Sequence, residues 1–183
     1  MKIGIIGSGG REHALCEALN KSEKVSKIYC FPGNAGTQQI ATNIDLDIDN
    51  FEILRKFIKE EQIDIIIVGP EKPLVNGIVD FLESHKIKVF GPNKMASQLE
   101  GSKIFTKDLC KKYSIPTANY GVFKNKEEAN SFLKNCNLPI VVKADGLAAG
   151  KGVYICESLD QAEEAIKEIF LGKHGKASQI LIE

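Results

Sequence analysis

The amino half of the chain alternates short apolar runs with segments of helical periodicity, and this alternation limits the possible folds more than any other feature. Four runs typical of buried strands occur, at residues 2–6, 27–31, 64–68 and 88–90. Four apolar residues between the last two runs have the helical spacing i, i+3, i+4 and i+7: Val75, Ile78, Val79 and Leu82. This βαβαβαβ pattern predicts an α/β fold with a parallel sheet, helices on both faces, and ligands at the carboxyl ends of the strands.

A second helix is predicted between the second and third runs. Its apolar residues are Phe51, Leu54, Phe57 and Ile58. Asp49 lies three residues before Glu52, which is the spacing of a capping box. We therefore expect this helix to begin next to Asp49.

The carboxyl half has a different pattern, which begins with a polar helical stretch over residues 95–113. The elements expected after it are strands at 120–123, 140–143, 153–156 and 179–182, and helices at 126–135 and 159–170. Asn125 precedes Glu128, and Ser158 precedes Gln161, at capping-box spacing. We expect two domains, residues 1–102 and residues 103–183. The last strand has no later strand to close its sheet, which favours a fragment of a longer protein over the alternative, a natural terminus on an edge strand.

Composition excludes several classes of function. The chain has 24 basic and 24 acidic residues, so no net positive charge attracts nucleic acid or an anionic membrane. It has no apolar run of membrane-spanning length, and its apolar start is too short for a signal peptide. The five cysteines are widely spaced without a C-x-x-C pair, so we interpret them as reduced core residues. We expect a soluble cytoplasmic protein.

The first candidate site is the glycine-rich segment directly after the first strand. Gly9 and Gly10 allow close backbone approach at a helix start, where free N–H groups favour an anion, and Arg11 adds a cationic fork. The dinucleotide fingerprint is absent, because Glu12 stands where its third glycine would be and the second strand ends without an acid. The alternative is an ordinary tight turn.

Two further loops follow the next two strands, so they lie at the same edge of the predicted sheet. The first contains Gly33, Asn34, Gly36 and Thr37. Its amides could form an anion-binding nest and its threonine supplies a hydroxyl, although an ordinary turn is equally consistent with the residues. In the second loop, prolines on both sides stiffen the chain around Glu71, which could otherwise be simply solvated.

The fourth candidate lies in the carboxyl half. Lys143 stands inside an apolar strand, where an unpaired ammonium is costly, so we expect it to face an anionic partner. The loop after it is suited to a flap that closes over phosphates, and it contains Gly146, Gly150, Lys151 and Gly152. It is not a Walker loop, because Gly152 stands where Ser or Thr is required. A glycine hairpin with a surface lysine is the alternative.

Together these segments resemble the phosphoribosylamine–glycine ligase (glycinamide ribonucleotide synthetase) family, a branch of the ATP-grasp superfamily. The resemblance covers essentially the whole chain and rests on the strings GSGGREHA, FPGNAGT, VGPEKPLVNGIVD, FGPNK, LEGSKIFTKD, IPTA, IVVKADGLAAGKGV and ILIE. Ser8 departs mildly from the pattern, since Asn is common there. The implied fold is a parallel-sheet, Rossmann-like pre-ATP-grasp domain, followed by the first, small part of an ATP-grasp domain.

The resemblance also implies binding roles for individual residues. It places the ribose phosphate among Gly9, Gly10, Arg11, Gly33, Asn34, Gly36 and Thr37, with Glu71 near the sugar or amine. It places the nucleotide against Lys103 and Lys143 under the flap of residues 146–152, with Glu183 beside the adenine. It assigns no catalytic residue and no metal ligand to this chain.

The implied reaction joins glycine to 5-phosphoribosylamine in purine synthesis. ATP phosphorylates the glycine carboxylate, and the amine then attacks the acyl phosphate, giving glycinamide ribonucleotide, ADP and phosphate. The residues for glycine and for Mg²⁺ or Mn²⁺ are expected beyond residue 183, so the chain alone should be inactive.

Three rival interpretations compete with the ligase. A Rossmann oxidoreductase is disfavoured by the absent third glycine and the absent acid after Phe31. A carboxylase-type ATP-grasp protein shares the general plan but not the strings GSGGREHAL and VGPEKPLVNG. A non-catalytic nucleotide-binding module is the third possibility, because a fragment can bind without catalysing.

Overall fold

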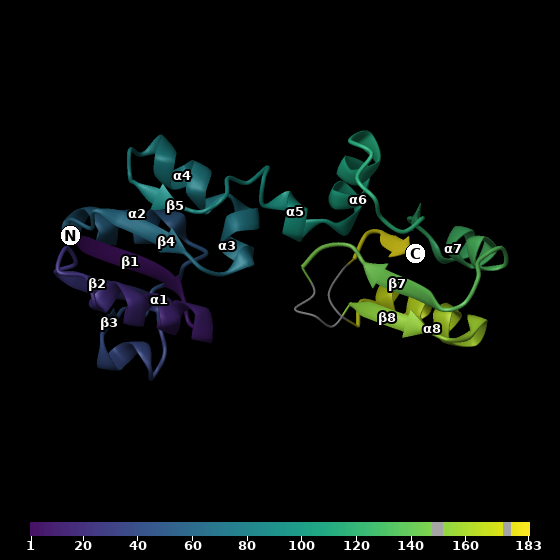
Figure 1. Ribbon diagram of the computed structural model, residues 1–183, viewed down its shortest axis with the longest axis horizontal. Coiled ribbons are helices and arrows are strands. Elements are labelled where there is room, and N and C mark those ends of the chain that lie inside the picture. The colour runs from purple at the N-terminus through teal and green to yellow at the C-terminus, as the bar shows by residue number, and fades with distance from the viewer. Residues whose placement is uncertain (148–151, 174–176) are drawn as a thin grey trace. The chain divides into compact units, whose positions relative to one another are not determined.

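The computed structural model describes residues 1–147, 152–173 and 177–183. The chain divides into two compact units, a first unit of Met1–Ser97 and a second unit of Gln98–Glu183. Each unit contains one sheet with its own helices (Figure 1).

The first unit is built on a five-stranded sheet in the order β3-β2-β1-β4-β5, and every pairing in it is parallel. Its strands are β1 (Lys2–Gly7), β2 (Lys27–Pro32), β3 (Thr42–Asn43), β4 (Ile65–Val68) and β5 (Val89–Phe90). The predicted parallel sheet is confirmed. Strand β3 was not predicted, because a two-residue polar edge strand has no apolar run.

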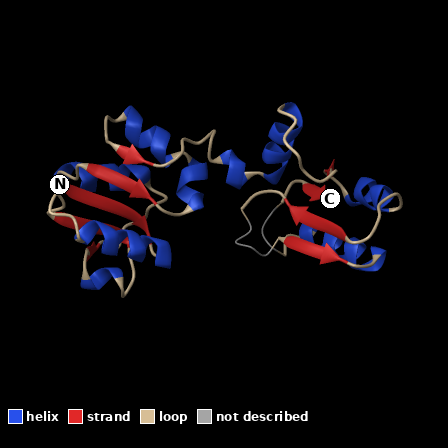
Figure 2. Cartoon of the chain, viewed as in Figure 1, coloured by secondary structure: helices blue, strands red, loops and turns tan. Residues whose placement is uncertain are grey.

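Helices cover both faces of this sheet, as predicted (Figure 2). On one face, Cys16 of α1 (Gly10–Asn20) packs with Ile3 and Ile5 of β1. The other face holds the larger core, in which Ile6 packs with residues of α2 (Phe51–Glu60), α3 (Glu71–Asn76) and α4 (Ile78–Ser84). A short 3-10 turn, η1 (Thr37–Gln39), precedes β3. Because β1, β2 and β4 are parallel, the loops that follow them all begin at the same edge of the sheet.

Two details of the predicted helices are wrong. The single helix through Val75 and Leu82 is divided at Gly77, whose φ of +92° is a left-handed conformation that ends α3 before α4 begins. The cap of α2 is Asn50, not Asp49, because the Asn50 side chain accepts from the amide of Ile53. Both differences arise from backbone geometry that apolar spacing does not determine.

The predicted continuous helix over residues 95–113 is also wrong. Two helices occur there, α5 (Gln98–Gly101) and α6 (Lys103–Lys112). They are separated by Ser102, which is extended and accepts from the amide of Phe105 at 3.1 Å. Ser102 therefore acts as a helix cap and starts α6 anew.

The second unit contains a four-stranded antiparallel sheet in the order β6-β9-β7-β8. Its elements are β6 (Gly121–Phe123), α7 (Lys126–Leu133), β7 (Ile140–Ala144), β8 (Val153–Cys156), α8 (Leu159–Phe170) and β9 (Ile180–Ile182). This is the predicted order. The predicted caps are confirmed as well, because Asn125 accepts from the amide of Glu128 and Ser158 from that of Gln161.

The two faces of the second sheet differ sharply. Ile140, Val142 and Ala144 pack against α7 and α8 in a closed core. The alternate residues of the same strands point the other way, toward what we call the far face. There Val153 and Ile155 of β8 are 44% and 73% exposed. The far face thus combines exposed apolar surface with the side chain of Lys143.

The cysteines are all free thiols. Cys16, Cys30 and Cys156 are buried, as expected, whereas Cys110 and Cys136 are half-buried. In the described part of the chain, no helix is long and apolar enough to cross a membrane.

Candidate functional site

The three loops predicted to meet at the carboxyl edge of the first sheet do lie together. Asn34, in the loop after β2, donates from Nδ2 to the carbonyl oxygens of Ser8 at 2.8 Å and Gly9 at 3.2 Å. The loop after β4 faces the same place, since Arg11 Nη2 lies 3.4 Å from Glu71 Oε2. We call these three segments, residues 7–11, 33–37 and 69–71, the loop edge.

The loop after β2 is shaped by Asn34 and Thr37. Asn34 Oδ1 accepts from the amides of Gly36 and Thr37, and Thr37 Oγ1 accepts from the amide of Asn34 at 2.7 Å. The Thr37 side chain is fully buried. The predicted contact of its hydroxyl with a ligand is therefore not supported, because that hydroxyl holds the loop together instead.

Both glycines of this loop are required by their neighbours. Gly33 has a φ of +76°, and an added Cβ there would overlap Asn43 and Thr37. At Gly36 an added Cβ would lie 2.6 Å from the ring of His13 on α1. The glycines thus let the second loop pack closely on the start of α1.

Glu12, which directly follows the first segment of the loop edge on α1, was not identified as functional from the sequence. Its side chain is buried, and Oε2 accepts from the amide of Gly9 at 2.6 Å. An added Cβ on Gly7 would come within 2.6 Å of this carboxyl group, and one on Gly69 would overlap Oε1. Glu12 therefore bonds to the first loop through Oε2 and packs closely against Gly69 of the third. The signal was present, because Glu12 stands three residues after the cap position of α1.

A hollow of about 430 Å³ opens at the loop edge. Its charged lining residues are Arg11, Glu12, Asp49, Glu71 and Lys72. Lys72 pairs with Asp49 at 2.5 Å, and the Arg11–Glu71 pair is mostly exposed, so its ionic bond is weak and easily exchanged for a ligand. Charges of both signs around one hollow suit a ligand that carries a phosphate and a polar, hydrogen-bonding end.

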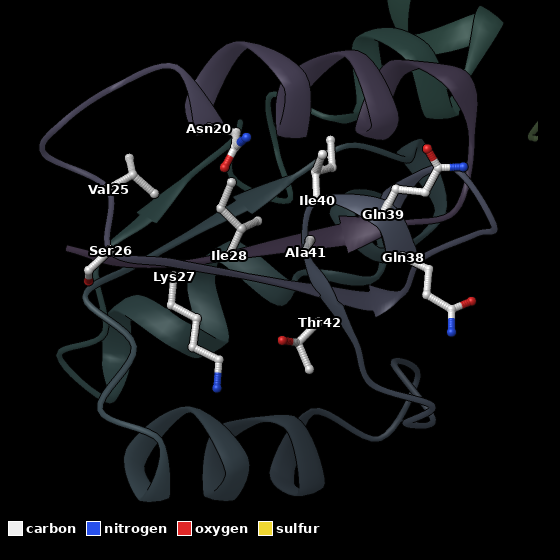
Figure 3. A pocket seen from close by; sticks show the side chains of 10 residues that line it. All are labelled: Asn20, Val25, Ser26, Lys27, Ile28, Gln38, Gln39, Ile40, Ala41 and Thr42. Atoms are coloured by element: carbon white, nitrogen blue, oxygen red, sulfur yellow. The ribbon is translucent and has the colours of Figure 1, made fainter.

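A second hollow of the first unit, of about 390 Å³, lies away from this edge. It is formed by the end of α1, the amino end of β2, and η1 with β3 (Figure 3). Its polar side chains, such as Asn20, Gln38 and Lys27, are exposed. No predicted site residue lines it.

In the second unit, Lys143 has the anionic partner that the sequence required. Lys143 of β7 and Glu183 after β9 are diagonal neighbours on the far face, because Lys143 is paired with Leu181 and Val141 with Glu183. The Lys143 ammonium donates to Glu183 Oε1. Two residues predicted to contact a nucleotide are thus bonded to each other.

Lys107 of α6 completes this group and was missed from the sequence. Its ammonium forms an ion pair with Glu183 Oε2, and the Lys107 and Glu183 side chains are 11% and 12% exposed. Burial raises the pKa of Glu183, but its bonds to Lys107 and Lys143 outweigh burial and leave that pKa below its ordinary value. A usable signal was the position of Lys107, one helical turn after Lys103.

Lys103 and the loop after β7 meet at the start of α6. Lys103 Nζ donates to the carbonyl oxygen of Gly146 at 2.9 Å. Asp145 accepts from the hydroxyl of Ser102 and from the amide of Ile104, so its carboxylate caps α6. Lys103 therefore lies beside the beginning of the predicted flap.

The predicted flap is only partly described. Gly146 has a φ of +100° with open space around its Cβ position, and the carbonyl of Gly152 accepts from the amide of Ala144. Gly150 and Lys151 lie outside the described residues. Within those residues, no group of three or more His, Cys, Asp or Glu side chains could hold a metal ion.

Comparison with known families gives matches over the whole chain. Residues 1–100 match the model described as phosphoribosylglycinamide synthetase, N domain, and residues 101–183 match its ATP-grasp (A) domain. A phosphoribosylamine–glycine ligase of Clostridium acetobutylicum is 48% identical over 100% of this chain and 44% of its own length. The chain thus spans less than half the length of this relative.

Solved structures are also similar over the whole length of this chain. A phosphoribosylamine–glycine ligase from Thermotoga maritima is similar with a TM-score of 0.81 and 34% identity, over 100% of this chain and 43% of that one. An N5-carboxyaminoimidazole ribonucleotide synthetase, solved as its ADP complex, has a TM-score of 0.74 at 23% identity, over 100% of this chain and 46% of that one. At this lower identity the likeness shows a shared fold only.

Proposed function

Because this chain belongs to the phosphoribosylglycinamide synthetase family, we propose that it is the amino-terminal part of an ATP-dependent carbon–nitrogen ligase. The ligase joins glycine to 5-phosphoribosylamine in purine biosynthesis, in the cytoplasm. ATP phosphorylates the glycine carboxylate, and the amine of phosphoribosylamine displaces phosphate from the glycyl phosphate. The products are glycinamide ribonucleotide, ADP and phosphate.

In this proposal the loop edge of the first unit binds phosphoribosylamine. The amides of Gly9 and Gly10 at the start of α1, together with Arg11, suit the phosphate group. Glu71, which faces Arg11 across the hollow, suits the sugar hydroxyls or the amine. Gly33, Asn34, Gly36 and Thr37 act indirectly, since their hydrogen bonds and close packing fix the second loop against the first.

The second unit binds ATP on its far face in this proposal. Lys103 and Lys143 suit the phosphates, and the exposed apolar side chains of β8 suit a base or a ribose. Residues 146–152, with Gly146, Gly150, Lys151 and Gly152, close over the phosphates, and Glu183 lies at the adenine end. The match of residues 101–183 to the ATP-grasp (A) domain of the family supports a nucleotide here.

A divalent metal ion, Mg²⁺ or Mn²⁺, would neutralise charge at the transferred phosphoryl group. Its ligands are proposed to lie beyond residue 183, and no step is assigned to it within this chain. What the described residues supply is the binding and orientation of the two phosphate-bearing substrates.

The observation that carries this proposal is that the two cationic sites lie in different units, so each can be removed separately. The test uses the full-length ligase that the proposal implies, assayed for glycine-dependent phosphate release. We expect Arg11→Ala to raise the KM for phosphoribosylamine roughly ten- to hundredfold, the effect of a lost charge-assisted bond. The KM for ATP should hardly change.

The converse variant is Lys143→Met, which keeps the aliphatic stem and removes the charge. It should weaken ATP binding and leave the KM for phosphoribosylamine unchanged. Lys88→Met, on a surface lysine outside both sites, is the control. If Arg11→Ala affected ATP alone, or Lys143→Met affected phosphoribosylamine alone, the assignment of the two sites would be wrong.

A further inference from the structure

Two ammonium groups share one carboxylate on the far face of the second sheet. Lys107 approaches Glu183 at Oε2 and Lys143 approaches it at Oε1. All three side chains are largely buried, so these charges interact more strongly than a surface pair would. One positive charge in the group remains without a balancing carboxylate, which favours an anionic ligand beside it.

The two lysines are held very differently. Besides Glu183, Lys107 Nζ donates to Thr117 Oγ1 at 2.8 Å and to the carbonyl of Ala118 at 3.1 Å, and it lies 5.5 Å from the ring centre of Tyr120. Two of the three N–H donors of its ammonium are used by these hydrogen bonds, and the ion pair with Glu183 holds its charge from a third direction. Lys107 is thus fixed in place.

Lys143 is less constrained. Within residues 1–147, 152–173 and 177–183, Glu183 is its one acceptor, which leaves two of its N–H donors for a ligand. Its side chain is 23% exposed, twice the exposure of Lys107. Of the two cations, Lys143 is therefore the one that can turn toward an incoming phosphate.

A turning Lys143 would leave Glu183 without its bond at Oε1. A largely buried carboxylate that lost all its partners would be costly, and it would pull Lys143 back from the phosphate. Because Lys107 stays bonded to Oε2, Glu183 remains neutralised while Lys143 moves.

We propose that Lys107 is a positioning residue that holds the Glu183 carboxylate and so releases Lys143 to the nucleotide phosphates. The inference rests on the proposed ATP site and adds a residue to it. Lys107 itself does not contact the nucleotide, because its donors are directed at Glu183 and at residues 117 and 118.

The experiment compares ATP dissociation constants of full-length variants. Lys107→Met should weaken ATP binding roughly tenfold. The Glu183 carboxylate would then have only Lys143 to balance its charge, and it would hold Lys143 back from the phosphates. Lys107→Arg, which keeps the charge, should restore most of the affinity. Lys112→Met is the control, because Lys112 is an exposed lysine on the same helix.

The decisive variant is Lys107→Met combined with Glu183→Gln. If Lys107 acts through the Glu183 carboxylate, its removal has no further effect once that charge is gone, so the double variant should bind ATP like Glu183→Gln alone. If Lys107→Met instead lowered the ATP affinity by the same factor in the unmodified protein and in Glu183→Gln, Lys107 would contact the nucleotide or merely support the fold. The proposal would then be overturned.

A second measurement does not depend on nucleotide. The carboxyl group of Glu183, followed by ¹³C NMR against pH, should titrate at higher pH in Lys107→Met than in the unmodified protein. An unchanged titration would overturn the positioning role. Failure of the unmodified protein to bind ATP would overturn the proposed nucleotide site itself. If the unmodified protein binds ATP but the losses of affinity from Lys107→Met and Glu183→Gln simply add in the double variant, only the role of Lys107 would be overturned.

Discussion

The ammonium of Lys143 and the carboxylate of Glu183 form an ion pair between residues 40 positions apart, across the antiparallel strands β7 and β9. Antiparallel pairing brings them to the same face as diagonal neighbours. The pair gives a strand lysine its anionic partner, and it makes the stability of the second unit depend on the charge of Glu183.

That dependence predicts how the stability changes with pH. The pKa of Glu183 is lowered on folding, so its ionised form stabilises the folded state above its ordinary pKa of 4.5, and this contribution is lost as the pH falls through the lower folded value. Urea unfolding from pH 7 to pH 3 should therefore show Glu183→Gln less stable than the unmodified chain at pH 7. The difference should shrink below about pH 4.5. A gap that stayed constant over this range would contradict the prediction.

The contact of Glu12 with Gly69 predicts a sensitive position at the loop edge. Gly69→Ala places a methyl group against Oε1 of Glu12, which is buried and can move only by disturbing its bond to the amide of Gly9. We expect a loss of roughly 1–3 kcal/mol in the free energy of unfolding of the first unit, as for other overpacked sites.

Two variants check the cause of that loss. Gly10→Ala is the matched control, because nothing lies within 4 Å of its Cβ position, and it should be nearly neutral. Adding Gly69→Ala to Glu12→Ala should cost much less than adding it to the unmodified chain, since the obstructing carboxyl group is gone. Equal costs in the two backgrounds would show that Glu12 is not the obstacle.

The 183-residue chain by itself should not catalyse the ligation. It spans 44% of the length of a relative that is 48% identical, and phosphoryl transfer depends on metal ions and charges that it is not proposed to supply. We expect no glycine-dependent phosphate release from ATP, together with cooperative unfolding of the first unit. Turnover of about 1–10 per second, which is ordinary for an enzyme, would show that the chain holds a complete active site.

The cysteines should fall into two classes of reactivity. Burial raises the pKa of Cys30 to about 12, and it also raises that of Cys16, so neither forms the reactive thiolate near pH 8. In the native chain, a thiol reagent should label the half-buried Cys110 and Cys136 before the buried cysteines. Unfolding should expose all five. Rapid labelling of Cys30 in the native chain would contradict its position in the core.

Much of the fold could be predicted because its signals are local. The strands of the first sheet stand out as apolar runs, and the helix starts at Asn125 and Ser158 depend on hydrogen bonds that span only three residues. The loop edge was predictable for a related reason, since consecutive parallel strands must bring their carboxyl ends to one side. The break at Gly77 was missed because apolar spacing does not reveal a left-handed φ.

The sequence by itself determined that Lys143 needs an anionic partner, because a charged side chain within an apolar strand cannot be left unpaired. Only the tertiary structure decided that Glu183 is this partner, that Lys107 shares it, and that Glu12 lies packed between two loops at the other site. The physical reason is that strand register and the docking of α6 determine which distant charges meet. Strand register and helix docking each depend on many contacts between distant parts of the chain, so they cannot be predicted from any short segment of the sequence.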